Sequence, residues 1–146
     1  MSLEGYTEQG VGVPRLAGYD MFSKEFPKYK KGELLTQKVK KGNESIAECK
    51  PVIIAPDKVE VRFSVGAHFH SKATGQVLPS MYPDIKLLHY KNLGKEYMIN
   101  RYKQLAPRSS CTNKENKFGE HWYSNRSHKG MEKGFDKGVK DSKKVI

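Results

Sequence analysis

The side chains that could do chemistry in this sequence are mainly histidines. His68 and His70 form a His-x-His pair at the end of residues 59–69, a segment in which apolar and polar residues alternate strictly. On an extended strand, residues two apart point to the same side and lie about 6.6 Å apart along the chain. Both imidazoles can reach one metal ion from that spacing. This short motif leaves two readings open, a metal site and a pair of exposed or hydrogen-bonded histidines.

His89 is the third candidate. It follows the short apolar run of residues 85–88, which predicts a strand, and a helical pattern begins a few residues later. Pro107 should end that helix near residue 106. The helix places its apolar residues at the spacing of one face: Met98, Tyr102 and Leu105. Ligands collect at the carboxyl ends of strands in open α/β sheets, so His89 could bind a ligand or join the His-x-His pair; a structural, hydrogen-bonded histidine is the alternative.

No complete catalytic motif accompanies these histidines. The sequence contains no Asp-x-Asp, no glycine-rich phosphate loop before a helix, and no Ser-His-Asp or Cys-His arrangement with a recognisable spacing. Several carboxylates could act as a general base, namely Asp20, Glu25 and Asp84. Because the sequence indicates no partner that would perturb any of them, we select none.

Two segments with strand-like patterns should build the sheet that positions the histidines. Residues 50–56, KPVIIAP, form a short apolar run between prolines, which is typical of a buried strand with pinned ends. Residues 59–69 predict a second strand, and Pro56 with Asp57 supplies turn chemistry between the two. We therefore expect an antiparallel hairpin, and a small sheet built from residues 52–69 and 85–90.

Short helices and loops are expected elsewhere. Residues 18–26 gather several aromatic side chains and predict a short helix closed by Pro27. Residues 31–39 carry apolar residues at helical spacing and predict a second helix. Residues 1–18, rich in glycine, should be irregular, and residues 71–84 should form a loop.

Length and composition indicate one domain with a modest core. The chain has 146 residues, of which 36% are hydrophobic, and its mean hydropathy is −0.75. The two cysteines are far apart in the sequence and indicate neither a disulfide framework nor a zinc ribbon, which fits a reducing cytoplasm. No apolar run approaches the length that spans a bilayer.

The chain is strongly basic. Its net charge of +11 favours an anionic partner or surface. Lysines are spread along the chain and become dense after residue 124. We therefore divide the chain into a folded part, residues 1–123, and a basic flexible tail, residues 124–146, which should be mobile or at best a fraying helix.

The order of several motifs resembles one enzyme family. GYDMFSKEFP is followed by KPVIIAP, by an alternating strand that ends in GAHFH, by LLHYKNLGKEY with a basic and aromatic helix, and finally by FGEHW. Across residues 17–123 this order resembles the carboxyl-terminal half of bacterial family 2 glycosyltransferases of the GT-A fold, particularly those that build capsular and other surface polysaccharides.

The resemblance implies a fold and a site. The fold would be α/β (α+β in isolation), the carboxyl-terminal half of a GT-A fold with a small, mostly antiparallel sheet, flanking helices and a poorly ordered tail. Mg or Mn would assist departure of the diphosphate, shared with an Asp-x-Asp motif of an amino-terminal half that this sequence lacks. His89 would be a metal ligand and His68 a second choice, with Lys91 and His70 as substrate-binding residues.

The implied activity is transfer of a sugar from a nucleotide-diphosphate sugar to a polysaccharide or lipid-linked acceptor, in the cytoplasm or at the inner face of an anionic membrane. Two other classes stay open. A nucleic-acid-binding module could use the basic charge with three tyrosines, Tyr90, Tyr97 and Tyr102, although no RNP, KH or helix-turn-helix signature accompanies them. A metal-dependent hydrolase could use three histidines, His68, His70 and His89.

Overall fold

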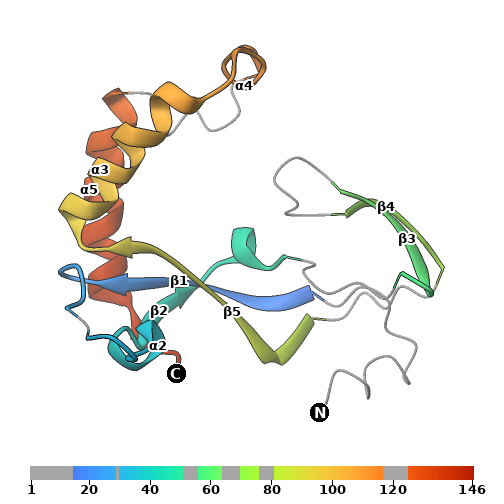
Figure 1. The fold of residues 1–146 in the computed structure, drawn as a ribbon, viewed down its shortest axis with the longest axis horizontal. Helices are drawn as coiled ribbons and strands as arrows, with labels where there is room; N and C mark the ends of the chain where they lie inside the picture. Colours follow the sequence, from blue (N-terminus) through green and yellow to red (C-terminus); the bar gives the residue numbers. More distant parts are fainter. Residues whose placement is uncertain (1–14, 29, 51–55, 64–69, 76–80, 117–124) are drawn as a thin grey trace. The chain divides into compact units, whose positions relative to one another are not determined.

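A computed structural model of the chain describes residues 15–28, 30–50, 56–63, 70–75, 81–116 and 125–146 (Figure 1). These residues form both helices and strands, which confirms the α/β class at that level. In chain order the elements are β1 (Arg15–Ser23), α2 (Leu35–Lys38), β2 (Lys41–Glu44), the 3-10 turn η1 (Ile46–Glu48), β3 (Val59–Phe63), β4 (His70–Gly75), β5 (Met81–Leu93), α3 (Lys95–Leu105), η3 (Ala106–Arg108), α4 (Cys111–Glu115), α5 (Asn125–Asp141) and β6 (Lys143–Lys144).

The chain divides into two compact units. The first contains Met1–Asp20 and Glu44–His89, and the second contains Met21–Asn43 and Tyr90–Ile146. Four strands pair in the order β5-β1-β2-β6, and β3 with β4 forms a separate two-stranded sheet. None of the described helices is long and apolar enough to cross a membrane.

In the first unit, β3 pairs antiparallel with β4. Val59 lies opposite Gly75 and Val61 opposite Ala73, with an irregularity at Arg62 and Phe63. The loop expected at residues 71–84 is therefore wrong, because most of that segment belongs to β4 and to the start of β5. The partner that we expected for β3, residues 52–55, lies outside the described residues.

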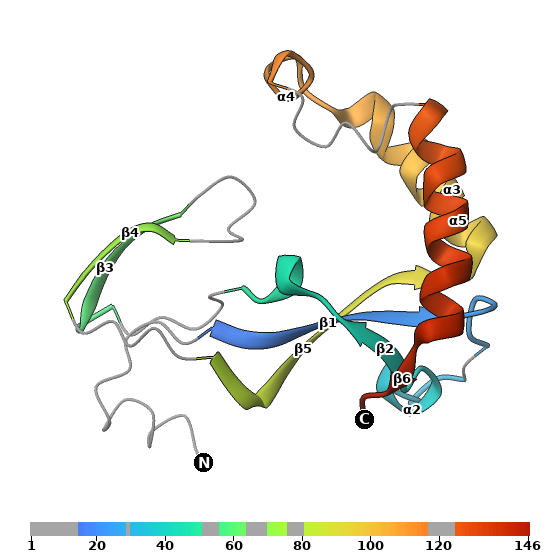
Figure 2. The same cartoon turned by 180° about the vertical axis from the view of Figure 1, so that it is seen from behind.

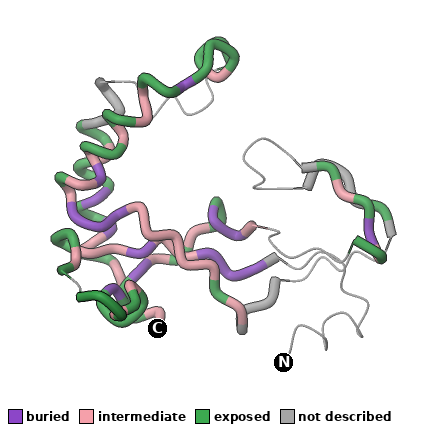
Figure 3. Tube along the Cα trace, in the orientation of Figure 1, coloured by how far each residue is buried: buried purple, intermediate pink, exposed green. Residues whose placement is uncertain are grey.

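β1 is a strand where we expected irregular chain and then a short helix. Strand alternation places Met21 and Phe22 on opposite sides. Met21 is fully buried, while the Phe22 ring lies 6.1 Å from the Phe135 ring, centroid to centroid. The neighbouring apolar side chains of this segment therefore pack on opposite faces of the chain. A strand allows this arrangement, whereas a helix that buries a single face does not. Figure 3 shows buried positions along β1 and in η1.

In the second unit, α3 confirms the predicted helix, and α2 is shorter than predicted. Met98 of α3 is buried, and the helix passes into η3, which contains Pro107. Gly94 precedes α3 with a φ of 88°, and its N–H donates to the Ser23 carbonyl at 2.9 Å. β5 continues to Leu93, so His89 lies within the strand rather than at its end.

The poorly ordered tail was also a wrong expectation, because residues 125–141 form α5, which lies beside α3 (Figure 2). Three contacts hold this basic helix in place. Phe135 is buried against Phe22, the Asn43 side chain donates to the Gly138 carbonyl at 2.9 Å, and Asp136 pairs with Lys95 at 2.7 Å. Composition alone could not reveal this, since a few specific contacts are enough to anchor a helix that is rich in charged residues.

Candidate metal centre

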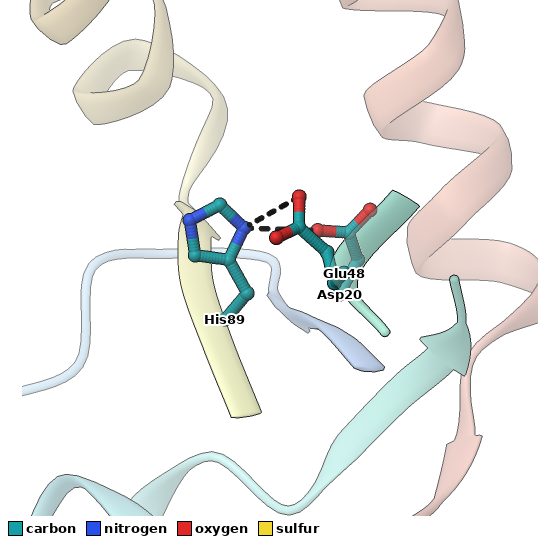
Figure 4. A group of neighbouring side chains, drawn as sticks. All are labelled: Asp20, Glu48 and His89. Carbon is teal, nitrogen blue, oxygen red and sulfur yellow. Dashed lines mark ion pairs between the residues drawn. The ribbon is translucent and has the colours of Figure 1, made fainter. Parts of the chain in front are cut away.

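Three side chains from distant parts of the sequence converge in the first unit (Figure 4). Asp20 comes from β1, Glu48 from η1 and His89 from β5. The Nδ1 atom of His89 lies 3.0 Å from Oε1 of Glu48 and 3.5 Å from Oδ1 of Asp20. One ligand atom from each residue lies within 4.8 Å of the other two.

The turn η1 is held against β1 by the backbone. The Ser45 N–H donates to the Gly18 carbonyl at 2.9 Å, and the Gly18 N–H donates to Sγ of buried Cys49 at 3.3 Å. The Cys49 thiol donates in turn to the Ser45 carbonyl at 3.4 Å. These contacts fix Glu48 beside Gly18, and Asp20 lies two residues further along the same side of the strand. The carboxylates are therefore brought together by backbone packing rather than by attraction between themselves.

The two carboxylates differ in their access to solvent. The Glu48 side chain is only 5% exposed, that of Asp20 is 20% exposed, and that of His89 is 41% exposed. The Lys50 ammonium lies 3.4 Å from Oε2 of Glu48 and balances part of the negative charge. Burying two carboxylates side by side is costly unless positive charge accompanies them, so a further cation is favoured at His89.

Two kinds of cation fit this position. One is the His89 side chain itself, which would pair with both carboxylates only if it carried a proton. The other is a divalent metal ion, since donors that each lie about 2.1 Å from an ion are about 3–4 Å from one another. The observed separations of 3.0 and 3.5 Å fall in that range. A set of one imidazole and two carboxylates suits Mn²⁺ or Zn²⁺ better than Mg²⁺, which prefers oxygen ligands throughout.

The residues predicted from the sequence fall in different places. His89 belongs to the group of three. His68 lies outside the described residues, and His70 begins β4 without a described side chain, so their proposed roles stay predictions. Lys91 occupies a half-buried position further along β5 and is not one of the three.

Sequence reasoning did not select the two carboxylates. Asp20 was one of several possible bases, and Glu48 was not considered. No local signal could identify Glu48, because its partner residues are distant in sequence and its burial results from the close approach of η1 to β1. The glycine at position 18 allows this close approach, but a single glycine in a sequence does not by itself predict a close contact between two backbones.

Comparisons with models of protein families, with curated protein sequences and with solved structures found no match to this chain.

Proposed function

We propose that this chain is the acceptor-side part of a metal-dependent glycosyltransferase of the GT-A type. It would act in moving a sugar from a nucleotide-diphosphate sugar to a polysaccharide or lipid-linked acceptor. The observation that carries the proposal is the surroundings of His89. The histidine that the family resemblance marks as a metal ligand is also the histidine with two carboxylates at 3.0 and 3.5 Å.

The proposal gives each side chain a distinct part. Glu48 is too buried to meet a substrate, so its role is to hold the cation and to orient the imidazole. Asp20 and His89 are more exposed and form the side of the group that solvent and substrate can reach. A bound Mn²⁺, which this ligand set suits better than Mg²⁺, would supply the Lewis acidity that stabilises a departing nucleoside diphosphate.

In this proposal the nucleotide is bound by a separate domain that carries an Asp-x-Asp motif, because the present sequence has no such motif. Lys91 and His70 remain predicted substrate contacts. The basic charge of the chain is compatible with an anionic, diphosphate-bearing substrate.

The test uses the longest reading frame that contains this sequence. The purified protein is incubated with Mn²⁺ and a panel of nucleotide-diphosphate sugars, and release of nucleoside diphosphate is measured. We expect metal-dependent release, and a loss of at least about tenfold in turnover for His89→Ala, the size typical for residues that support a metal site. Lys58→Ala, which changes a charged residue outside the group of three, is the matched control and should retain turnover.

Two results would contradict the proposal. One is a full reading frame that neither carries a nucleotide-binding domain nor releases nucleoside diphosphate from any donor. The other is unchanged metal-dependent turnover in the His89→Ala protein, which would leave His89 with a structural role.

A further inference from the structure

Helix α5 carries a straight row of lysines on the side opposite its buried face. Lys129, Lys133, Lys137 and Lys140 are four, four and three residues apart, so they lie on one face of the helix over about 16 Å. All four side chains are exposed. Phe135 and Gly138, which face the body of the unit, are buried.

These four ammonium groups are not used to hold the fold together. Within the part of the chain that the structure describes, none of the four forms an ion pair. The acidic residue that does make an ion pair in α5, Asp136, pairs with Lys95 of α3 instead. A row of like charges at this spacing is mildly destabilising for an isolated helix, so its presence calls for an external partner of opposite charge.

A cavity beside the row indicates what kind of partner this is. It has a volume of about 550 Å³, and its lining combines cationic side chains with an apolar floor: Lys24, Lys95, Phe135, Asp136, Val139 and Lys140. Lys140 belongs both to the row and to the cavity. Three lysines and one aspartate leave an excess of positive charge around Phe135 and Val139. This combination suits an anionic head group joined to an apolar chain.

We propose that the lysine row of α5 and the adjoining cavity bind the surface of a membrane that contains anionic phospholipid. The row would contact several head groups at once, because a straight ridge of ammonium groups can lie along a plane. The helix would lie on the surface without inserting, because its apolar face is already buried against the body of the unit. Each lysine near an anionic bilayer contributes modestly, which makes such binding reversible and sensitive to salt.

Nucleic acid is a poorer fit to the same surface. Recognition of single strands relies on exposed aromatic rings on which bases stack. Phe135 is the only phenylalanine, tyrosine or tryptophan in α5, and it is 4% exposed. Lysine also presents a single ammonium charge, whereas the planar guanidinium group of arginine can form two parallel hydrogen bonds to a phosphate group. Neither the row nor the cavity includes a metal-centre residue, so this proposal stands or falls separately from the proposed function.

The test is sedimentation of the whole chain with lipid vesicles. Vesicles of phosphatidylcholine that contain phosphatidylglycerol should carry the protein down at low salt, and vesicles of phosphatidylcholine alone should not. Lys133→Gln with Lys137→Gln should weaken the partitioning about 30-fold, since each lysine near the surface contributes about 1 kcal/mol. Lys31→Gln with Lys114→Gln removes the same charge from two exposed positions outside α5 and should retain most of the binding.

A second measurement separates lipid from simple phosphate. A soluble short-chain phosphatidylglycerol should shift the NMR amide signals of Phe135 and Val139, and inorganic phosphate at the same concentration should not. Equal loss of vesicle binding in the two double variants would overturn the proposal by showing that only total charge matters. So would absence of binding to the anionic vesicles, or tighter binding to a single-stranded oligonucleotide at the same ionic strength.

Discussion

The backbone of Gly18 in β1 lies directly against the backbone of Glu48 in η1. A Cβ atom built on Gly18 would lie 2.2 Å from the Glu48 carbonyl carbon and 2.5 Å from the Cys49 nitrogen. No side chain fits there, so glycine at this position is a condition for placing Glu48 beside Asp20. The candidate metal centre therefore depends on a contact that involves none of the side-chain atoms that could bind the ion.

Gly18→Ala should disturb both the fold and the site. Because the added methyl group meets backbone rather than a movable side chain, we expect a loss of about 2–3 kcal/mol in the free energy of unfolding, measured by urea denaturation. Divalent metal affinity, measured by calorimetry on the folded protein, should fall at least about tenfold, because η1 must shift and carry Glu48 away from His89. Unchanged stability together with unchanged metal affinity would show that the close approach is not required.

Two glycines of α5 should respond in opposite directions to the same substitution. A Cβ on Gly134 meets nothing within 4 Å, whereas a Cβ on Gly138 would lie 2.3 Å from the Phe22 ring. Gly134→Ala should raise the free energy of unfolding by about 0.5–1 kcal/mol, because alanine favours helix and restricts the unfolded chain. Gly138→Ala should lower it by about 1–3 kcal/mol, because the ring is packed against Phe135 and cannot move freely.

Urea denaturation of both variants beside the parent protein provides the comparison. Each variant serves as the control for the other, since helix propensity changes equally in both. Changes of the same sign in the two proteins would contradict the packing of α5 on β1 through Phe22.

Tyr90 should make the protein sensitive to alkaline pH. Its hydroxyl is buried and forms no hydrogen bond to a described residue, and burial raises the pKa of the phenol. Because the phenol ionises more readily in the unfolded chain, its effect on stability is constant below the ordinary pKa of about 10 and becomes unfavourable as the pH rises toward the folded-state pKa.

Tyr90→Phe should therefore make the fall in stability above pH 10 shallower. At neutral pH the variant should be as stable as the parent or up to about 1 kcal/mol more stable, because a buried hydroxyl without a partner is removed. Chemical denaturation at neutral and alkaline pH measures both effects. An equally steep alkaline decline in the variant would exclude Tyr90 as its source.

The sequence allowed some elements to be predicted and not others, for physical reasons that differ. The helix at residues 95–105 was predicted correctly, because the spacing of Met98, Tyr102 and Leu105 and the position of Pro107 act locally. β1 was wrong because its apolar residues pack on both faces, which removes the alternation that identifies a strand. β4 was wrong because its HSKATG sequence carries no strong strand pattern and depends on pairing with β3.

The candidate site was also predicted only in part, because its residues come together through contacts between segments that are distant in the sequence. His89 stood out because it was expected at the carboxyl end of a strand, where ligands collect in open α/β sheets. Glu48 lies beside His89 only because η1 packs against Gly18, and this contact joins segments that are distant in the sequence. Side-chain chemistry can be read from a sequence, but convergence of this kind requires the fold.

The most direct test of the central claim is a Mn²⁺ titration of the whole chain, followed by electron paramagnetic resonance of the free ion. The parent protein should bind one Mn²⁺ at the centre, and His89→Ala or Asp20→Asn should weaken that binding at least about tenfold, with circular dichroism confirming that each variant is folded. His128→Ala, a histidine in α5, should bind as the parent does. Absence of Mn²⁺ binding in the parent, or equal affinity in His89→Ala and His128→Ala, would contradict a metal centre and leave His89 with a structural role beside the two carboxylates.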